Sequence, residues 1–352
     1  MNNRIEWLDS LRGIGIIIVI LIHATGNEHV RGVLFNFGVP LFIFVSGYVF
    51  NGERYPSWTG FVLNRLKTRI VPYVIWFLIL YAVVIMQNSN SLETFLQYLS
   101  NFTRSDFLAG LFSGDVNWLS RTVNNGPLWF LPFLFLTENI FFLVRKVSGL
   151  VMIGLMVVFI SVSMDMLSSA VAGIPALVSM ASTHLVTFGA GFIVNKAREQ
   201  RRLFPDNRIA LAALWVVSIV LSIVGGEMFG TGPVTTLVGF AFRYVVTFCG
   251  IIAFGMLASY VRGCEGLRFL GAKTLVIFIL NEPLRALSCD VFAAVNFGFF
   301  DNLFTAHREL FTLIQVMAVL LLSVPCVYLI NTYLPFLIGK HARQRSRDRA
   351  PV

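Results

Sequence analysis

Long apolar stretches, separated by short polar segments, run along almost the whole chain. Stretches of about 20 apolar residues are long enough to cross a bilayer as helices. The pattern therefore predicts an all-α integral membrane protein with about ten transmembrane helices. The stretches lie near residues 8–25, 32–50, 70–87, 127–144, 150–164, 170–194, 209–226, 233–260, 272–297 and 310–338.

Composition supports this prediction and charge adds an orientation. Hydrophobic residues make up 57% of the 352 residues and charged residues 13%, whereas soluble domains have about 25% charged residues. Lysine and arginine concentrate in every second connection between the ten stretches and at both ends of the chain, which predicts an N-in, C-in topology. Outer segments hold only Arg31, Arg104, Arg121 and Arg308 of the 27 lysines and arginines, and Arg243 and Arg285 fall within stretches.

We expect one membrane domain over residues 1–340 and a basic cytoplasmic tail over 341–352. The tail is expected to contact anionic membrane lipids, and we expect no nucleic acid partner. Residues 92–99 and 107–112 predict short helices lying on the outer membrane surface. The stretch 272–297 contains several polar residues and Pro283, so it predicts a broken or re-entrant helix.

Arg12 and His23 are eleven positions apart in the first stretch. That spacing is close to three helical turns, so both side chains share a helix face about 16 Å apart. With Arg12 at one membrane surface, His23 would lie deep in the hydrocarbon layer, where an ionisable side chain is costly and indicates function. The alternative is a histidine that hydrogen-bonds a neighbouring helix. We favour a functional base at His23, with Asp9 pairing with Arg12 at three residues' spacing.

Three cations, Arg65, Lys67 and Arg69, precede the third stretch at the predicted inner face. The positive-inside rule explains part of this cluster. The phosphates of a nucleotide-like cofactor also require such cations, and arginine suits them best. No glycine-rich phosphate loop, nucleophile elbow or metal-ligand cluster occurs in the sequence, so we expect no metal and no tightly bound cofactor.

A further set of residues is polar or aromatic within or at the edge of apolar stretches. One interpretation is a buried ion pair between Arg243 and either Glu138 or Glu282, and we expect Arg243 to pair with Glu282. The alternative is that these residues together line a polar cavity for a hydroxylic substrate. Its members are Trp129, Glu138, Arg243, Asn281 and Glu282, with Arg285 nearby.

Several segments occur in an order known from one family. They are residues 7–13 with His23, 39–48, 65–73 and 126–131, with weaker matches at 188–191 and 270–275. With them the chain resembles the acyltransferase-3 family of polytopic membrane O-acyltransferases, especially its fucose 4-O-acetylase-like branch. The arginine-x10-histidine pair followed by the run ending in Ser46 and Gly47 is the specific part. Ser46 and Gly47 also predict close helix packing.

The resemblance implies an O-acetyltransferase of the bacterial inner (plasma) membrane. Such enzymes move an acyl group, usually acetyl, from cytoplasmic acyl-CoA to a hydroxyl of a cell-surface glycan or its lipid-linked precursor. It assigns catalysis to His23 and acyl-CoA binding to Arg12, Arg65, Lys67 and Arg69. Acyl-CoA, the glycan or lipid-linked sugar acceptor, membrane lipids and envelope-biosynthesis proteins are the expected partners.

The chain departs from the family pattern at two places. Asn281 stands where many relatives have histidine, and Asn27 followed by Glu28 stands where relatives often have an acidic residue. Either change indicates a different acceptor or altered chemistry. The rival hypotheses are a transporter or flippase with a proton relay of His23, Glu138 and Glu282, and an inactive relative that acts as a sensor or assembly partner.

Overall fold

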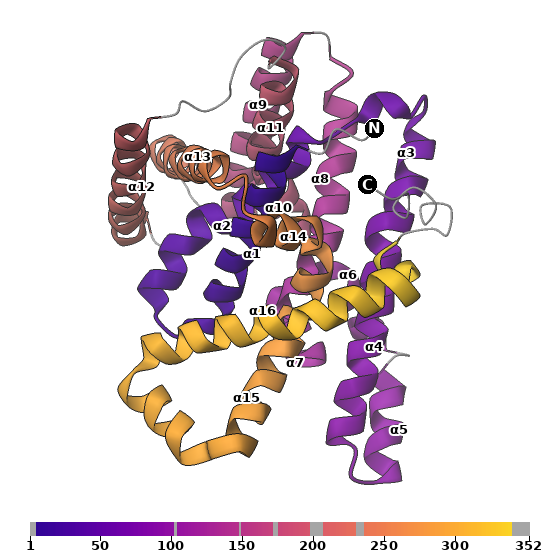
Figure 1. The fold of residues 1–352 in the computed structure, drawn as a ribbon. Coiled ribbons are helices and arrows are strands. Elements are labelled where there is room, and N and C mark those ends of the chain that lie inside the picture. Colours follow the sequence, from indigo (N-terminus) through magenta and orange to yellow (C-terminus); the bar gives the residue numbers. More distant parts are fainter. Residues whose placement is uncertain are drawn as a thin grey trace.

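The computed structural model describes residues 5–101, 104–147, 149–171, 175–197, 207–229 and 236–339. Regular structure in these ranges is helical and includes no strand, so the predicted all-α fold is confirmed. The predicted tail 341–352 lies outside the described residues. Figure 1 shows the helices in order. They are α1 (Glu6–Ala24), α2 (Glu28–Tyr48), η1 (Gly52–Arg54), α3 (Trp58–Arg65), η2 (Leu66–Ile70), α4 (Val71–Asn88), α5 (Leu92–Asn101), α6 (Ser105–Ser113), α7 (Val116–Val123), η3 (Gly126–Trp129), α8 (Phe130–Val144), α9 (Leu150–Ala170), α10 (Ala176–Thr183), α11 (Leu185–Ala197), α12 (Arg208–Phe229), α13 (Leu237–Tyr260), α14 (Glu265–Ala272), α15 (Thr274–Ala306), α16 (Arg308–Tyr333) and η4 (Pro335–Ile338).

Nine helical segments within the described part of the chain are long and apolar enough to cross a membrane. They coincide with nine of the ten predicted stretches, so the chain is a multi-pass membrane protein. The remaining stretch, 272–297, corresponds to α15, whose first half carries Glu282, Arg285 and Asp290. The N-in, C-in orientation stays a prediction.

Helix α15 differs from the expected broken helix. It is continuous from Thr274 to Ala306 and includes Pro283. Its ribbon runs away from the bundle, turns and comes back to the start of α16 (Figure 1). A proline inside a helix removes one hydrogen bond and bends the helix without necessarily ending it. Helix α15 therefore continues through Pro283 instead of breaking there.

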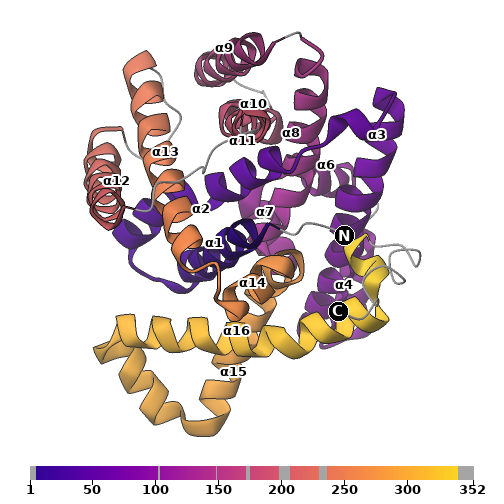
Figure 2. The same ribbon diagram turned by 45° about the horizontal axis from the view of Figure 1, so that its top comes forward.

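Helix α1 lies at the centre of the bundle. It packs against α2, α13, α14, α15 and α16, and Figure 2 shows it among α2, α13 and α14. Most of its apolar side chains are buried, with Leu11, Ile16 and Ile20 fully so. Because α1 is enclosed on several sides, the polar side chains of Asp9 and Ser10 are also buried.

Glycines allow two helix pairs to approach closely. A Cβ at Gly13 of α1 would overlap the carbonyl of Leu267 in α14, and one at Gly271 of α14 would overlap the carbonyl of Asp9. Gly47 of α2 lies in the same way against the carbonyl of Phe188 in α11. The predicted close packing at Gly47 is thereby confirmed, and the match at 270–275 marks a second crossing of this kind.

Helices α5 to α7 connect α4 to α8. The expected short helices at 92–99 and 107–112 are present as α5 and α6. Helix α5 runs beside α4 (Figure 1), and the Tyr81 hydroxyl donates to the Tyr98 carbonyl at 2.8 Å. Helix α7 packs against α4 through Trp118, whose ring stacks on Phe77. The connection is thus tied to the bundle by aromatic contacts.

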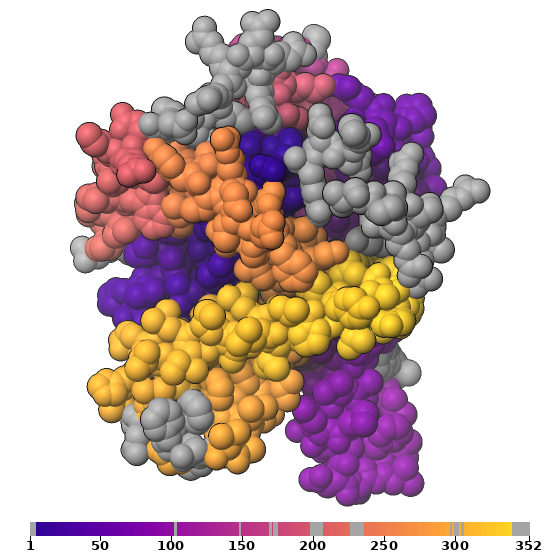
Figure 3. Space-filling model, in the orientation of Figure 1, coloured from indigo at the N-terminus to yellow at the C-terminus, as the bar shows by residue number. Residues whose placement is uncertain are grey.

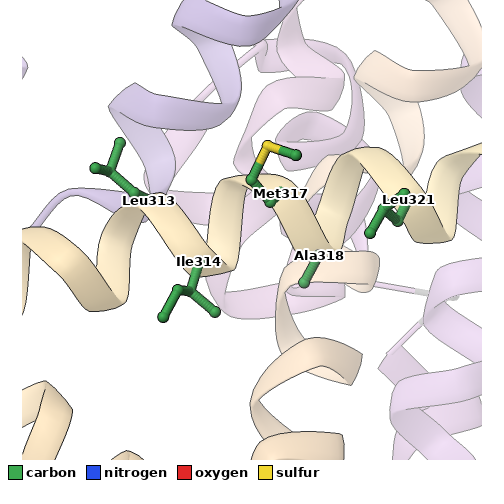
Figure 4. Close-up of a pocket in the computed structure, with 5 residues that line it drawn as sticks. All are labelled: Leu313, Ile314, Met317, Ala318 and Leu321. Carbon is green, nitrogen blue, oxygen red and sulfur yellow. The ribbon is translucent and has the colours of Figure 1, made fainter.

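The side of the molecule seen in Figure 3 is crossed by α16 as a continuous band. A shallow depression of about 330 Å³ runs along this helix and is lined by Leu313, Ile314, Met317, Ala318 and Leu321 (Figure 4). These side chains supply no polar group for chemistry. Exposed apolar surface of this kind fits contact with lipid tails, as expected for a membrane helix.

Candidate active site

His23 is paired with a carboxylate from the other end of the chain. Its Nδ1 lies 3.0 Å from Oε1 of Glu282, which α15 brings against α1. The second oxygen of Glu282, Oε2, accepts hydrogen bonds from Arg285 at 3.0 Å (Nε) and 2.8 Å (Nη2). The side chain of Glu282 is 13% exposed and that of His23 is 27% exposed. This series of arginine, carboxylate and imidazole orients the ring, and Nε2 is the ring nitrogen that does not face Glu282.

The depth expected for His23 does not follow from the helix bounds. Helix α1 begins at Glu6 rather than at Arg12, and His23 lies in its last turn. Arg12 therefore stands inside the helix, where its Nη1 lies 3.3 Å from Oδ1 of Asp9. The predicted pairing of Arg12 with Asp9 is confirmed. Contact with Glu282, rather than depth in the membrane, marks His23 as a candidate functional residue.

The expected pairing of Glu282 with Arg243 is wrong. Arg285 is three residues after Glu282 on the same helix face and takes that role. The Nη1 of Arg243 lies 3.6 Å from Oδ2 of Asp165 in α9. Asp165 was not among the expected partners because the predicted fifth stretch ends at 164, whereas α9 continues to Ala170.

Arg65 and Arg69 converge on Glu138, which is buried in α8. The Nε of Arg65 lies 3.1 Å from Oε2 of Glu138, and the Nη2 of Arg69 lies 3.0 Å from Oε1. Glu138 is 3% exposed, and the Arg65 guanidinium also lies 4.8 Å from the ring centre of Phe61. Two cations thus share one carboxylate, and the group keeps a net positive charge.

The backbone that carries these arginines is irregular. Residues Leu66–Ile70 form a π-helical turn, η2, between α3 and α4. Single π turns inside α-helices are rare and often occur at functional sites. Lys67 lies in this turn but is exposed, so it does not join Arg65 and Arg69 at Glu138. The structure therefore divides the predicted cationic cluster into a buried pair and an exposed lysine.

Trp129 and Asn281, two further candidate site residues, are both buried, and neither lines an open surface. Trp129 packs edge-on against Phe130 and Phe133. Asn281, next to Glu282, is fully buried, and neither polar atom of its amide has a hydrogen-bond partner among the described residues. Asn281 is thus a buried amide whose hydrogen-bonding capacity remains open beside the His23 partner.

A family model described as an acyltransferase domain matches residues 5–332. The match covers α1 and nearly all of α16 and includes every predicted site residue. The chain belongs to the acyltransferase-3 family. Comparisons with curated proteins and with solved structures found no match. As a member of this family with its apolar helices, the chain is a multi-pass membrane acyltransferase.

Within this acyltransferase, sequence reasoning identified His23, Glu282, Arg65, Arg69 and Glu138 but not their grouping. The structure joins the first two to each other and the other three to one another. It leaves Arg243 with Asp165 and Arg12 with Asp9. One signal was available in the sequence for Arg285, because its spacing of three from Glu282 is the spacing of a helical ion pair.

Proposed function

We propose that this acyltransferase moves an acyl group, expected to be acetyl, from cytoplasmic acyl-CoA to a hydroxyl of a cell-surface glycan or its lipid-linked precursor. The expected location is the bacterial inner membrane. The observation that carries the proposal is the 3.0 Å contact between His23 Nδ1 and Glu282 Oε1. A carboxylate at Nδ1 keeps the imidazole proton on that nitrogen, and Nε2 is then able to accept a proton.

In the proposed reaction, His23 acts on the acceptor hydroxyl. The proton of the hydroxyl passes to Nε2 as the oxygen attacks the thioester carbonyl carbon. The carbon–sulfur bond breaks, and the CoA thiolate leaves and takes the proton from Nε2. Glu282 stabilises the imidazolium that exists between these transfers, and Arg285 holds Glu282 in place. An acyl-histidine route would use the same nitrogen as nucleophile.

The acyl-CoA phosphates are assigned to Arg65 and Arg69. The pair carries a net positive charge after Glu138 is counted, and the buried Nε of Arg69 has no hydrogen-bond partner among the described residues. A guanidinium with a free N–H suits a phosphate oxygen. Lys67, exposed in the same turn, and Arg12 are the further proposed contacts. The remaining candidates for contacts with the acceptor are Trp129, Glu138, Arg243 and Asn281. Glu138 also holds Arg65 and Arg69 in place.

The test measures transfer of labelled acetyl from acetyl-CoA to a bacterial envelope glycan extract by the purified protein. We expect His23→Ala to lower kcat by about 10²–10⁴-fold, the usual share of a general base, and to keep acetyl-CoA binding. Glu282→Gln should also lower kcat, because the uncharged amide stabilises imidazolium poorly. The matched controls are His29→Ala, an exposed histidine, and Glu265→Gln, whose pair with Arg268 has the same spacing as Glu282 with Arg285.

The outcome separates the competing functions. A mass increase of one acetyl group on the glycan, lost in His23→Ala, supports the enzyme. Accumulation of an unmodified glycan lipid inside vesicles would support the transporter. Substantial transfer by His23→Ala with normal folding would remove His23 from the catalytic role.

A further inference from the structure

Pro283 leaves a backbone carbonyl of α15 without its usual donor. In an α-helix the carbonyl of Ile279 would accept from the N–H of residue 283, and Pro283 has no N–H. A buried carbonyl without a partner costs free energy comparable to a lost hydrogen bond. Asn125 supplies the missing donor. Its Nδ2 donates to the Ile279 carbonyl at 2.7 Å, and the Asn125 side chain is fully buried.

A second example of this arrangement occurs in α2. Pro40 lies in that helix four residues after Asn36, and the Asn36 carbonyl accepts a hydrogen bond from Thr247 Oγ1 of α13 at 3.0 Å. Both donors come from segments far away in the sequence. The two sites differ in the helical turn next to the freed carbonyl. In α15 that turn carries Glu282, the partner of His23, whereas the corresponding turn of α2 carries no residue of the candidate site.

Asn125 is well placed to fix this turn of α15. It directly precedes η3, whose residues Gly126–Trp129 are all buried and pack on α15. The chain that follows Asn125 is therefore packed in place, and the Asn125 amide reaches the Ile279 carbonyl from there. The carbonyl of Ile279 is one turn before Glu282, so its position sets the direction in which Glu282 leaves the helix.

We propose that Asn125 is a positioning residue for acyl transfer: by holding the Ile279 carbonyl that Pro283 leaves without a donor, it keeps Glu282 in contact with His23. The catalytic consequence rests on the proposed function of His23. Because reaction rates are sensitive to displacements of about 1 Å, a shift of the helical turn that carries Glu282 should lower turnover more than it lowers substrate binding. Asn125 touches neither substrate nor reacting atoms in this role, and acts through Glu282.

The first experiment asks whether Asn125 serves the proline-freed carbonyl, and it is read from thermal unfolding of the purified protein. Asn125→Leu should lower Tm in the natural sequence. In a Pro283→Ala background the N–H of residue 283 bonds the Ile279 carbonyl, so Asn125→Leu should lower Tm much less. Two substitutions that act on the same carbonyl should have non-additive effects on Tm. Equal losses of Tm in both backgrounds would therefore overturn the proposal.

The second experiment asks whether the effect on the site exceeds a loss of stability. Thr247→Val removes the equivalent hydrogen bond at Asn36 and is the matched control. We expect Asn125→Leu to lower kcat about 10-fold or more while KM for acetyl-CoA changes less than about 2-fold. Thr247→Val should lower Tm and leave kcat within about 2-fold. If both variants lower only Tm, Asn125 has a structural role alone and the positioning proposal fails.

The third experiment does not depend on acyl transfer. His23→Cys and Glu282→Cys are combined in a protein whose four native cysteines are replaced by alanine, and disulfide formation is monitored after addition of an oxidant. We expect the cross-link to form several-fold more slowly when Asn125→Leu is added and at an unchanged rate with Thr247→Val. An unchanged rate with Asn125→Leu would overturn the positioning role. Absence of transfer by the unaltered protein would instead overturn the proposed function.

Discussion

At the scale of single residues, buried charge decides which groups belong together. Glu138 is almost fully buried, and two arginines lie at 3.1 Å and 3.0 Å from its oxygens. A buried carboxylate is tolerated only when it is paired and hydrogen-bonded. Glu138 therefore constrains where Arg65 and Arg69 can point. The two guanidiniums are held in place before any ligand arrives, which lowers the entropy cost of binding an anion.

This constraint leads to a prediction about acyl-CoA. Arg65→Ala and Arg69→Ala should each raise KM for acetyl-CoA more than they lower kcat, because a phosphate contact is equally strong in the ground and transition states. Salt should weaken acetyl-CoA binding to the natural protein and weaken it less in these variants. Lys196→Ala, which removes an exposed cation paired with Glu53, is the control. A fall in kcat at constant KM would contradict the assignment to CoA.

At the scale of elements, the site depends on how closely α1 and α14 cross. Gly271 of α14 lies against the carbonyl of Asp9, and Gly13 of α1 lies against the carbonyl of Leu267. Helix α14 leads into α15 after Lys273, so its seat on α1 sets where α15 starts. Small residues at membrane helix crossings allow backbones to approach, and larger ones push them apart. The crossing therefore helps to bring Glu282 to His23.

We predict that Gly271→Ala lowers the stability of the protein by about 1–3 kcal/mol, the usual cost of overpacking. The added methyl group would overlap the backbone of α1, which cannot move as a side chain can. The measurement is thermal unfolding together with turnover per folded molecule. Gly266→Ala on the same helix is the control, because its Cβ would meet nothing within 4 Å. Tolerance of Gly271→Ala with full activity would show that the crossing is adjustable.

At the scale of the whole molecule, nine helical segments of the described chain match apolar stretches seen in the sequence. Their length and composition follow from hydrophobic runs alone, which is why they could be predicted. The orientation of the bundle rests on the distribution of lysine and arginine between the connections. It also decides which side of the membrane Arg65 and Arg69 face, and so where acyl-CoA would enter.

A reporter test checks this orientation. Fusions after Val352 and within 196–208 should report the cytoplasm, and a fusion near Asn117 should report the outside. The expectation follows from the excess of cations in the segments predicted inside. A cytoplasmic signal at Asn117 or an outside signal at Val352 would contradict the N-in, C-in model and the cytoplasmic entry of acyl-CoA.

The sequence by itself determined the helices, the membrane class, the family motifs and the candidate residues His23, Arg65 and Arg69. These follow from local composition and from spacing along a single helix, which a linear chain records directly. The partners of these residues were decided by the tertiary structure. Glu138 is separated from Arg69 by 69 positions, and Asn125 from Ile279 by 154.

The incorrect pairing of Glu282 with Arg243 shows the limit of sequence reasoning. Two residues that are polar within apolar stretches have many possible partners, and their order along the chain does not rank them. Packing decides instead: α15 lies on α1, so Glu282 meets His23, while Arg243 meets Asp165 of α9. Pro283 is read from the sequence, but the residue that satisfies the carbonyl it frees, Asn125, is decided by the packing of η3 on α15.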